Sequence, residues 1–133
     1  MIALDTNILV RLIVHDDVAQ ARAAERLLIR ARREQTPLFV ADVVLCELAW
    51  VLTRRVGLSR AAIADALDRL LRTELIVVAD AAVAEAALEA YRTGKGDFAD
   101  YVIREQAKAA EASEVVTFDR ALRGESGFRI LST

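Results

Sequence analysis

The sequence has very few of the residues that most often catalyse reactions or bind metals through sulfur or nitrogen. Cys46 is the only cysteine among 133 residues, which excludes an internal disulfide and any zinc cage built from cysteines. His15 is the only histidine, so chemistry that needs two histidines is excluded and a Ser-His triad is disfavoured. Any catalysis must therefore depend on carboxylates, hydroxyls and basic side chains.

Proline and glycine are also scarce, with one proline and five glycines, which leaves little room for linkers. Hydrophobic residues make up 55% and charged residues 29%, a composition typical of a globular protein. The length fits one domain over residues 1–133. No segment approaches the roughly 18 uncharged apolar residues of a membrane span, and no signal peptide is recognisable, so we expect a cytoplasmic protein. The net charge of −2 does not decide whether nucleic acid is bound.

Short β-prone runs alternate with longer runs of helical periodicity along the whole chain. Because strands separated by helices favour a parallel sheet, the expected fold class is α/β, with one central parallel sheet flanked by helices. The predicted strands cover residues 2–4, 38–40, 75–78, 115–118 and 128–131, and the predicted helices cover 18–33, 42–55, 59–72, 80–92 and 97–111.

An aspartate follows each of four predicted strands: Asp5, Asp42, Asp80 and Asp119. In parallel sheets, ligands bind beyond the carboxyl ends of the strands, where the strand order reverses. Aspartate is also among the best helix N-caps, so each of the four has an alternative role at the start of the next helix.

Glu47 is a carboxylate that helix capping does not explain. Its neighbours one helical turn away are apolar (Val43, Val44, Trp50 and Val51), so we expect a charge on a buried helix face. Such a charge costs several kcal/mol unless it is paired or coordinates a metal. A metal ligand or catalytic group is one interpretation, and a buried ion pair with Arg11, Arg54 or Arg104 is the other.

Asp97 and Asp100 lie three residues apart in the first turn of a predicted helix, so both carboxylates can approach one region of space. They have a purely structural alternative, which is stabilisation of the helix N-terminus or a pair between Asp100 and Arg104. Two like charges at about 4 Å repel by roughly 4 kcal/mol at an effective dielectric near 20, and a cation reverses this cost. Oxygen ligands of this kind suit Mg²⁺ or Mn²⁺, which activate water for the hydrolysis of a phosphodiester.

Four segments in order resemble the motifs of PIN-domain ribonucleases. They are Asp5-Thr6-Asn7 after the first strand, Glu47 within Leu45–Ala49, Asp97–Ile103, and Thr117–Leu122. The order, the spacing and the length of the chain all agree with that family. Within it, the size and the opening Asp-Thr-Asn-Ile-Leu-Val are most similar to VapC-type toxins, the toxic half of bacterial and archaeal toxin–antitoxin pairs.

The resemblance implies a five-stranded sheet of order 3-2-1-4-5, with a switch point between the strands that end at Asp5 and Asp119. It leaves Asp42 and Asp80 as helix caps. It implies that the catalytic residues and ligands of Mg²⁺ or Mn²⁺ are Asp5, Glu47, Asp100 and Asp119, with Asp97 as an accessory carboxylate for a second ion. Thr6, Asn7 and Thr117 would orient ligands or water by hydrogen bonds.

The implied activity is cleavage of single-stranded RNA by water, a metal-dependent endoribonuclease reaction. The residues expected to contact RNA phosphates are Arg11, Lys95, Arg104, Arg120 and Arg123, each of which is otherwise ordinary solvated surface. The implied partners are a VapB-like antitoxin and a second copy of the chain. The antitoxin's tail would lie in an apolar groove of the early helices, which Leu12, Ile13 and Val14 would line unless they belong to the core. No membrane is expected among the partners.

Two other functions are compatible with parts of the pattern. A PIN domain that binds RNA or a partner without cutting keeps the same acids, and a housekeeping nuclease keeps the same chemistry. A receiver domain of a signalling protein would use Asp80 as a phosphoacceptor, but Thr6 and Asn7 follow Asp5 where a receiver has adjacent acids. Asn7 also replaces the second acid that a haloacid-dehalogenase-type phosphatase needs.

Overall fold

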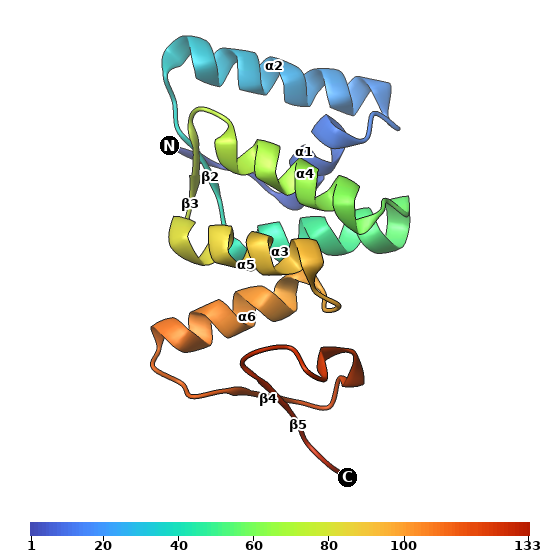
Figure 1. Ribbon diagram of the computed structural model, residues 1–133. Helices are drawn as coiled ribbons and strands as arrows, with labels where there is room; N and C mark the ends of the chain where they lie inside the picture. The colour runs from blue at the N-terminus through green and yellow to red at the C-terminus, as the bar shows by residue number, and fades with distance from the viewer. The chain divides into compact units, whose positions relative to one another are not determined.

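The computed structural model describes all residues from Met1 to Thr133, and the chain forms two compact units, Met1–Ala79 and Asp80–Thr133 (Figure 1). The elements of the first unit are β1 (Ile2–Ala3), α1 (Thr6–Ile13), α2 (Val18–Glu34), β2 (Leu38–Val40), α3 (Asp42–Val51), a π-helix (Leu52–Val56), α4 (Arg60–Arg72) and β3 (Ile76–Val78). Those of the second are α5 (Ala81–Thr93), α6 (Phe98–Ala109), β4 (Val115–Thr117), a 3₁₀ turn (Arg120–Leu122) and β5 (Phe128–Ile130).

All strand pairs are parallel, and they form two sheets. In the first unit the order is β1-β2-β3, with Ala3 opposite Phe39 and Phe39 opposite Val77. In the second unit β4 pairs with β5, with Val116 opposite Arg129. The α/β class with parallel strands is therefore confirmed. The single sheet of order 3-2-1-4-5 is not confirmed, because β1 pairs only with β2 and β4 pairs only with β5.

Each unit has its own hydrophobic core, built from the buried faces of its helices. In the first unit the side chains of Leu9, Leu45, Leu48, Leu52 and Leu67 are all at most 2% exposed. In the second unit aromatic rings take this role: Tyr91 meets Phe98 edge-to-face at 6.0 Å between ring centroids, and Tyr101 meets Phe128 in the same way at 6.2 Å. Whether residues 1–133 act as one domain stays a prediction.

The helices begin and end where short polar side chains and glycine dictate. Asp17, Ser59 and Asp80 accept hydrogen bonds from backbone N–H groups in the first turns of α2, α4 and α5. Gly57 closes the π-helix with φ at +78°, a left-handed conformation that suits glycine.

The predicted cap at Asp80 is confirmed, whereas the one at Asp42 is wrong. Ala41 is the N-cap of α3 and Asp42 is the first helical residue, because the extended cap conformation falls on the residue directly after β2. The pattern assigned no element to residues 6–13, which form α1. None of the helices combines the length and the hydrophobicity that crossing a membrane requires.

Candidate active site

Asp5 stands at the end of β1, where it caps α1. Its carboxylate Oδ1 accepts a hydrogen bond from the backbone N–H of Thr6 at 2.8 Å, and its side chain is exposed. Thr6 itself is only 3% exposed, and its hydroxyl Oγ1 is the one buried side-chain polar atom without a hydrogen-bond partner. Asn7 is exposed beside it. The predicted Asp-Thr-Asn motif therefore combines an accessible carboxylate with an unsatisfied hydroxyl.

Glu47 lies on α3 with an apolar neighbourhood, as the spacing predicted, but this face is not buried. Glu47 is exposed, and so are two of its four apolar neighbours, Val43 at 71% and Trp50 at 53%, whereas Val51 is buried. The core face of α3 is formed by Leu45, Leu48, Ala49 and Val51 instead. The expectation of a buried charge was therefore wrong, because the helix turns its other side to the core. Glu47 stands accessible among exposed apolar groups.

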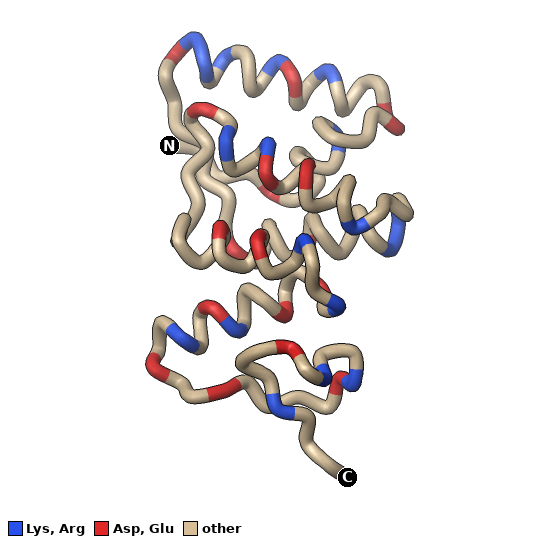
Figure 2. The backbone as a smooth tube through the Cα atoms, in the orientation of Figure 1, with Lys and Arg blue, Asp and Glu red and all other residues tan.

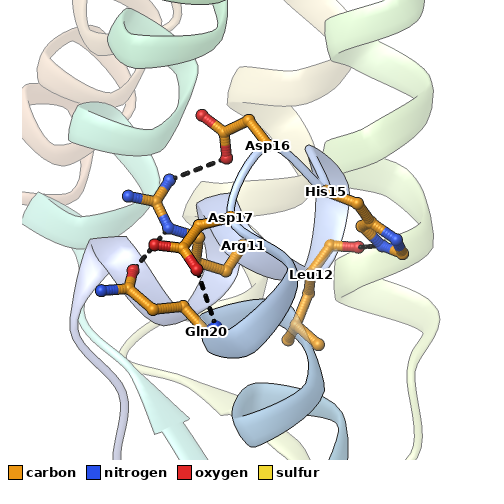
Figure 3. A network of polar contacts seen from close by, with 6 residues as sticks. All are labelled: Arg11, Leu12, His15, Asp16, Asp17 and Gln20. Atoms are coloured by element: carbon orange, nitrogen blue, oxygen red, sulfur yellow. Dashed lines mark hydrogen bonds and ion pairs between the residues drawn. The ribbon is translucent and has the colours of Figure 1, made fainter.

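Arg11 belongs to a polar network between α1 and α2 (Figure 3). Its guanidinium donates to Gln20 Oε1 at 2.6 Å and to Asp16 Oδ1 at 3.0 Å. Asp17 in turn accepts from the backbone N–H of Gln20 at 3.0 Å. Arg11 is thus held by two residues around the start of α2, and a contact between it and RNA stays a prediction.

Three of the predicted carboxylates gather in the second unit. Asp100 has its pKa raised above the ordinary value for aspartate, first by burial and then by the nearby negative charges of Asp97 and Asp119. A hydrogen bond from the backbone N–H of Asp97 to Asp100 Oδ2, 2.8 Å long, acts in the opposite direction. Asp100 is half-buried, whereas Asp97 and Asp119 are exposed. Their mutual repulsion is the electrostatic condition that a bound cation relieves.

The loop before α6 is fixed by contacts that the sequence did not disclose. Tyr101 is fully buried, and its hydroxyl accepts from the N–H of Gly96 at 3.1 Å and donates to Glu125 Oε1 at 2.7 Å. Glu125 Oε1 also accepts a hydrogen bond from the backbone N–H of Lys95 at 2.7 Å. A side chain at Gly96 would meet the end of the buried Leu122 side chain, which would have to shift to make room. The glycine-rich turn at residues 94–96 was the only available signal for this arrangement.

Asp119 is oriented by hydrogen bonds within its own loop. Its backbone N–H donates to Thr117 Oγ1 at 3.0 Å, and its Oδ1 accepts from the N–H of Ala121 at 2.9 Å. Thr117 therefore positions the backbone at Asp119, which is compatible with the predicted supporting role for this hydroxyl.

The basic residues predicted to contact RNA differ in how available they are. The Arg104 side chain is only 12% exposed, donates to Glu105 and to the carbonyl of Ser126, and lies over the ring of Tyr101 at 5.2 Å. It has a packing role in this unit. Lys95 is exposed, and its side chain has no ion pair.

Arg120 and Arg123 line a cavity of about 850 Å³ in the second unit. Phe118, 64% exposed, forms part of the same wall, as does Arg129, whose guanidinium is paired with Glu114 at 2.7 Å. No aspartate or glutamate side chain lines this cavity, whose walls combine arginines, apolar residues and the hydroxyl residues Ser132 and Thr133. Asp119 lies between Phe118 and Arg120 in sequence, although it does not itself line the cavity.

In neither unit do three or more carboxylate, histidine or cysteine side chains lie close enough together to hold a metal ion. The chemistry of the donors nevertheless fits a hard cation. Asp97, Asp100 and Asp119 offer oxygen ligands alone, which Mg²⁺ and Mn²⁺ prefer, and their charges repel one another. Of the predicted site residues, the second unit thus brings together these three, while Asp5 and Glu47 are exposed in the first.

A model of the PIN domain matches residues 2–124. The chain belongs to the PIN domain family. No curated protein and no solved structure matches the chain. PIN domains are typically nucleases and generally bind divalent metals, so the match supports a nuclease-like protein. It covers all four predicted acidic motifs of this PIN domain. The roles assigned to individual residues stay predictions.

Proposed function

We propose that this PIN domain is a metal-dependent endoribonuclease that cleaves single-stranded RNA. One observation carries the proposal: the negative charges of Asp97 and Asp119 both act on Asp100, and Asp119 stands in sequence between Phe118 and Arg120, which line a cavity with further arginines. Such a cavity attracts a phosphodiester and allows a base to stack on Phe118. The carboxylates supply the ligands for the cation that hydrolysis of this bond needs.

In this proposal Asp5, Glu47, Asp100 and Asp119 hold Mg²⁺ or Mn²⁺, and Asp97 assists. A bound cation would supply the Lewis acidity that activates water and the positive charge that stabilises the phosphate. The protein's own groups do the rest: Thr6 and Asn7 orient Asp5, Thr117 fixes the backbone of Asp119, and Arg120 and Arg123 bind phosphates.

The proposal includes the five-stranded order 3-2-1-4-5, in which β1 and β4 are neighbours. Asp5 directly follows the strand-like Ile2–Leu4 segment, and Asp119 comes two residues after β4. Since the carboxyl ends of parallel strands share one edge of a sheet, this order places both aspartates at that edge.

We further propose that the protein is the toxin of a VapBC-type pair that dimerises and binds a VapB-like antitoxin. A groove of about 370 Å³ in the first unit supports this assignment, because its walls are mainly apolar and come from α1, α2, α4 and β3. Leu12 and Ile13, which were predicted to line an antitoxin groove, both line it, whereas Val14 does not. Arg69 is its one charged residue.

The test is cleavage of a mixed single-stranded RNA pool by the purified, antitoxin-free chain with Mg²⁺, with Mn²⁺ and with EDTA. Asp5→Asn and Asp100→Asn are expected to abolish metal-dependent cleavage. Asp80→Asn is the matched control, because Asp80 only caps α5 and asparagine caps as well. Cleavage that survives EDTA, or that both site variants retain, would refute the carboxylate mechanism.

A folded wild-type chain without activity on transfer, ribosomal or messenger RNA would favour the alternative, a PIN domain that binds RNA without cutting. The toxin assignment has a separate test. Expression of the wild-type chain should arrest growth, Asp5→Asn should not, and a small protein encoded beside it should relieve the arrest. Growth unaffected by an active nuclease would favour a housekeeping enzyme.

A further inference from the structure

Helix α2 carries positive charge that has no role in the proposed carboxylate site or in the proposed antitoxin groove. It has five arginines and two glutamates within 17 residues, a net charge of +3, although the whole chain has a net charge of −2. Figure 2 shows basic positions recurring along this helix. The charge of the molecule is therefore unevenly distributed, and α2 is its most basic element.

Four of these arginines form a stripe, defined here as Arg22, Arg26, Arg30 and Arg33. At 100° of rotation per residue they fall within about 80° of the helix circumference and span about 16 Å along the axis. All four are exposed, whereas Ala21, Ala24 and Ala31 face the core. The stripe is thus the solvent side of an amphipathic helix.

The stripe is poorly neutralised by the protein itself. Arg30 pairs with Glu34 at 3.0 Å, but Arg22, Arg26 and Arg33 have no ion-pair partner. An ordinary solvated helix alternates charges of both signs, which support each other one turn apart. Here like charges follow one another at that spacing, which disfavours the isolated helix and is relieved by a bound anion.

A shallow cleft of about 320 Å³ runs between these side chains, lined by Arg26, Ile29, Arg30, Arg33 and Glu34. Successive arginines are about 6 Å apart along the axis, so they present a row of cations to a row of anions. The helix has no aromatic residue to stack on a base, so the surface suits a phosphate backbone better than base recognition.

We propose that the arginine stripe of α2 binds the phosphate backbone of RNA, separately from the carboxylates that cut it. This inference takes its ligand from the proposed function but does not depend on cleavage. Guanidinium groups bind phosphate oxygens in pairs and keep their charge at any physiological pH. Binding at the stripe depends on the salt concentration and not on the RNA sequence. The stripe therefore holds the RNA, while the carboxylate site selects the phosphodiester bond that is cut.

The experiment measures binding of a fluorescent single-stranded RNA in EDTA, by anisotropy, at several salt concentrations. The variant Arg26→Ala/Arg33→Ala removes two arginines of the stripe. The matched control, Arg32→Ala/Arg55→Ala, removes two exposed arginines outside it and gives the same net charge. Alanine favours helix, so these exposed changes are expected to leave the fold intact, which circular dichroism checks.

Loss of two phosphate contacts should lower the slope of log affinity against log salt by about 1.4 and weaken binding up to about 25-fold at 0.1 M salt. The control variant should bind as the wild type does. Equal binding by the stripe variant and the wild type would overturn the proposal and favour an acidic protein partner. Equal losses in both variants would also overturn it, since they indicate a general charge effect.

Binding and cutting fail separately in this design. Asp100→Asn is expected to retain the binding seen in EDTA while losing metal-dependent cleavage. If the stripe variant loses binding and no metal supports cleavage by the wild type, the stripe stands and the nuclease proposal falls. If cleavage is metal-dependent and the stripe variant binds RNA as the wild type does, the nuclease stands and the stripe falls.

Discussion

The hydroxyl of Tyr101 is expected to hold the acidic loop of the second unit in place, and Tyr101→Phe tests this directly. The substitution removes one oxygen from a fully buried ring and leaves its packing against Phe128 unchanged. It deprives the buried N–H of Gly96 of its acceptor, 3.1 Å away, and Glu125 of a donor at 2.7 Å.

The magnitude follows from these two bonds. Removal of the acceptor from a buried N–H costs about 1–3 kcal/mol, and the lost bond to the half-exposed Glu125 adds about 1 kcal/mol. The free energy of unfolding should therefore fall by about 2–4 kcal/mol. With a urea dependence of about 2 kcal/mol per molar, the unfolding midpoint should move down by about 1–2 M.

The assay is urea unfolding followed by circular dichroism, repeated with Glu125→Gln and with the double variant. Because Tyr101 and Lys95 both bond to Glu125, the effects of the two single substitutions should not add. The RNA cleavage rate of Tyr101→Phe should fall even under conditions in which the protein remains folded, since the loop carries Asp97. A loss below about 0.5 kcal/mol in Tyr101→Phe, or strict additivity, would refute the reasoning.

The remaining predictions concern pH, a thiol and a cap. The pKa of Asp100 is raised, first by burial, so the native state binds more protons than the unfolded state. The free energy of unfolding should therefore fall as the pH rises above about 4. Asp100→Asn should flatten this fall in unfolding titrations, and an unchanged pH profile would contradict the prediction. The pKa of Glu125 is lowered, first by the N–H of Lys95 and then by Tyr101, so its contribution should be present above about 4.5 and disappear as the solution is acidified further; Glu125→Gln should lose this acid sensitivity. Burial, followed by the charge of Asp42, raises the pKa of the Cys46 thiol to about 11. A thiol reagent at pH 8 should therefore modify the native protein far more slowly than the urea-unfolded chain, and equal rates would argue against the burial. Asp80→Ala should cost about 1 kcal/mol in unfolding free energy because the N–H of Val83 loses its acceptor, while Asp80→Asn should cost little; equal losses would rule out capping as the cause.

Local signals in the sequence predicted the elements well, because they depend on neighbours along the chain. Ser59 and Asp80 cap helices at the predicted places, and Gly57 ends a helical segment as its left-handed backbone allows. The strand at residues 38–40 was predicted with its correct bounds. Each of these features is decided by a few adjacent residues.

Features that depend on packing could not be predicted from the sequence in the same way. Glu47 was expected on a buried face because its helical neighbours are apolar, yet the sequence does not say which side of an apolar helix meets the core. Tyr101 and Glu125 are 24 residues apart, and no periodicity links them. The approach of Asp119 to Asp100 was predicted only through the family resemblance, which supplies the strand order that residue patterns leave open.

The π-helix at Leu52–Val56 identifies where this chain can change its length. The N–H of Gly57 bonds to the carbonyl of Leu52, five residues earlier, so this turn holds one residue more than an α-helical turn. Deleting a single residue here, such as Thr53, would convert the wide turn into an ordinary one and leave both flanks in register. The same deletion in the middle of α3 or α4 would rotate all later side chains of that helix by about 100°. At the wide turn, insertion or deletion of one residue therefore disturbs the packing of the flanking helices little.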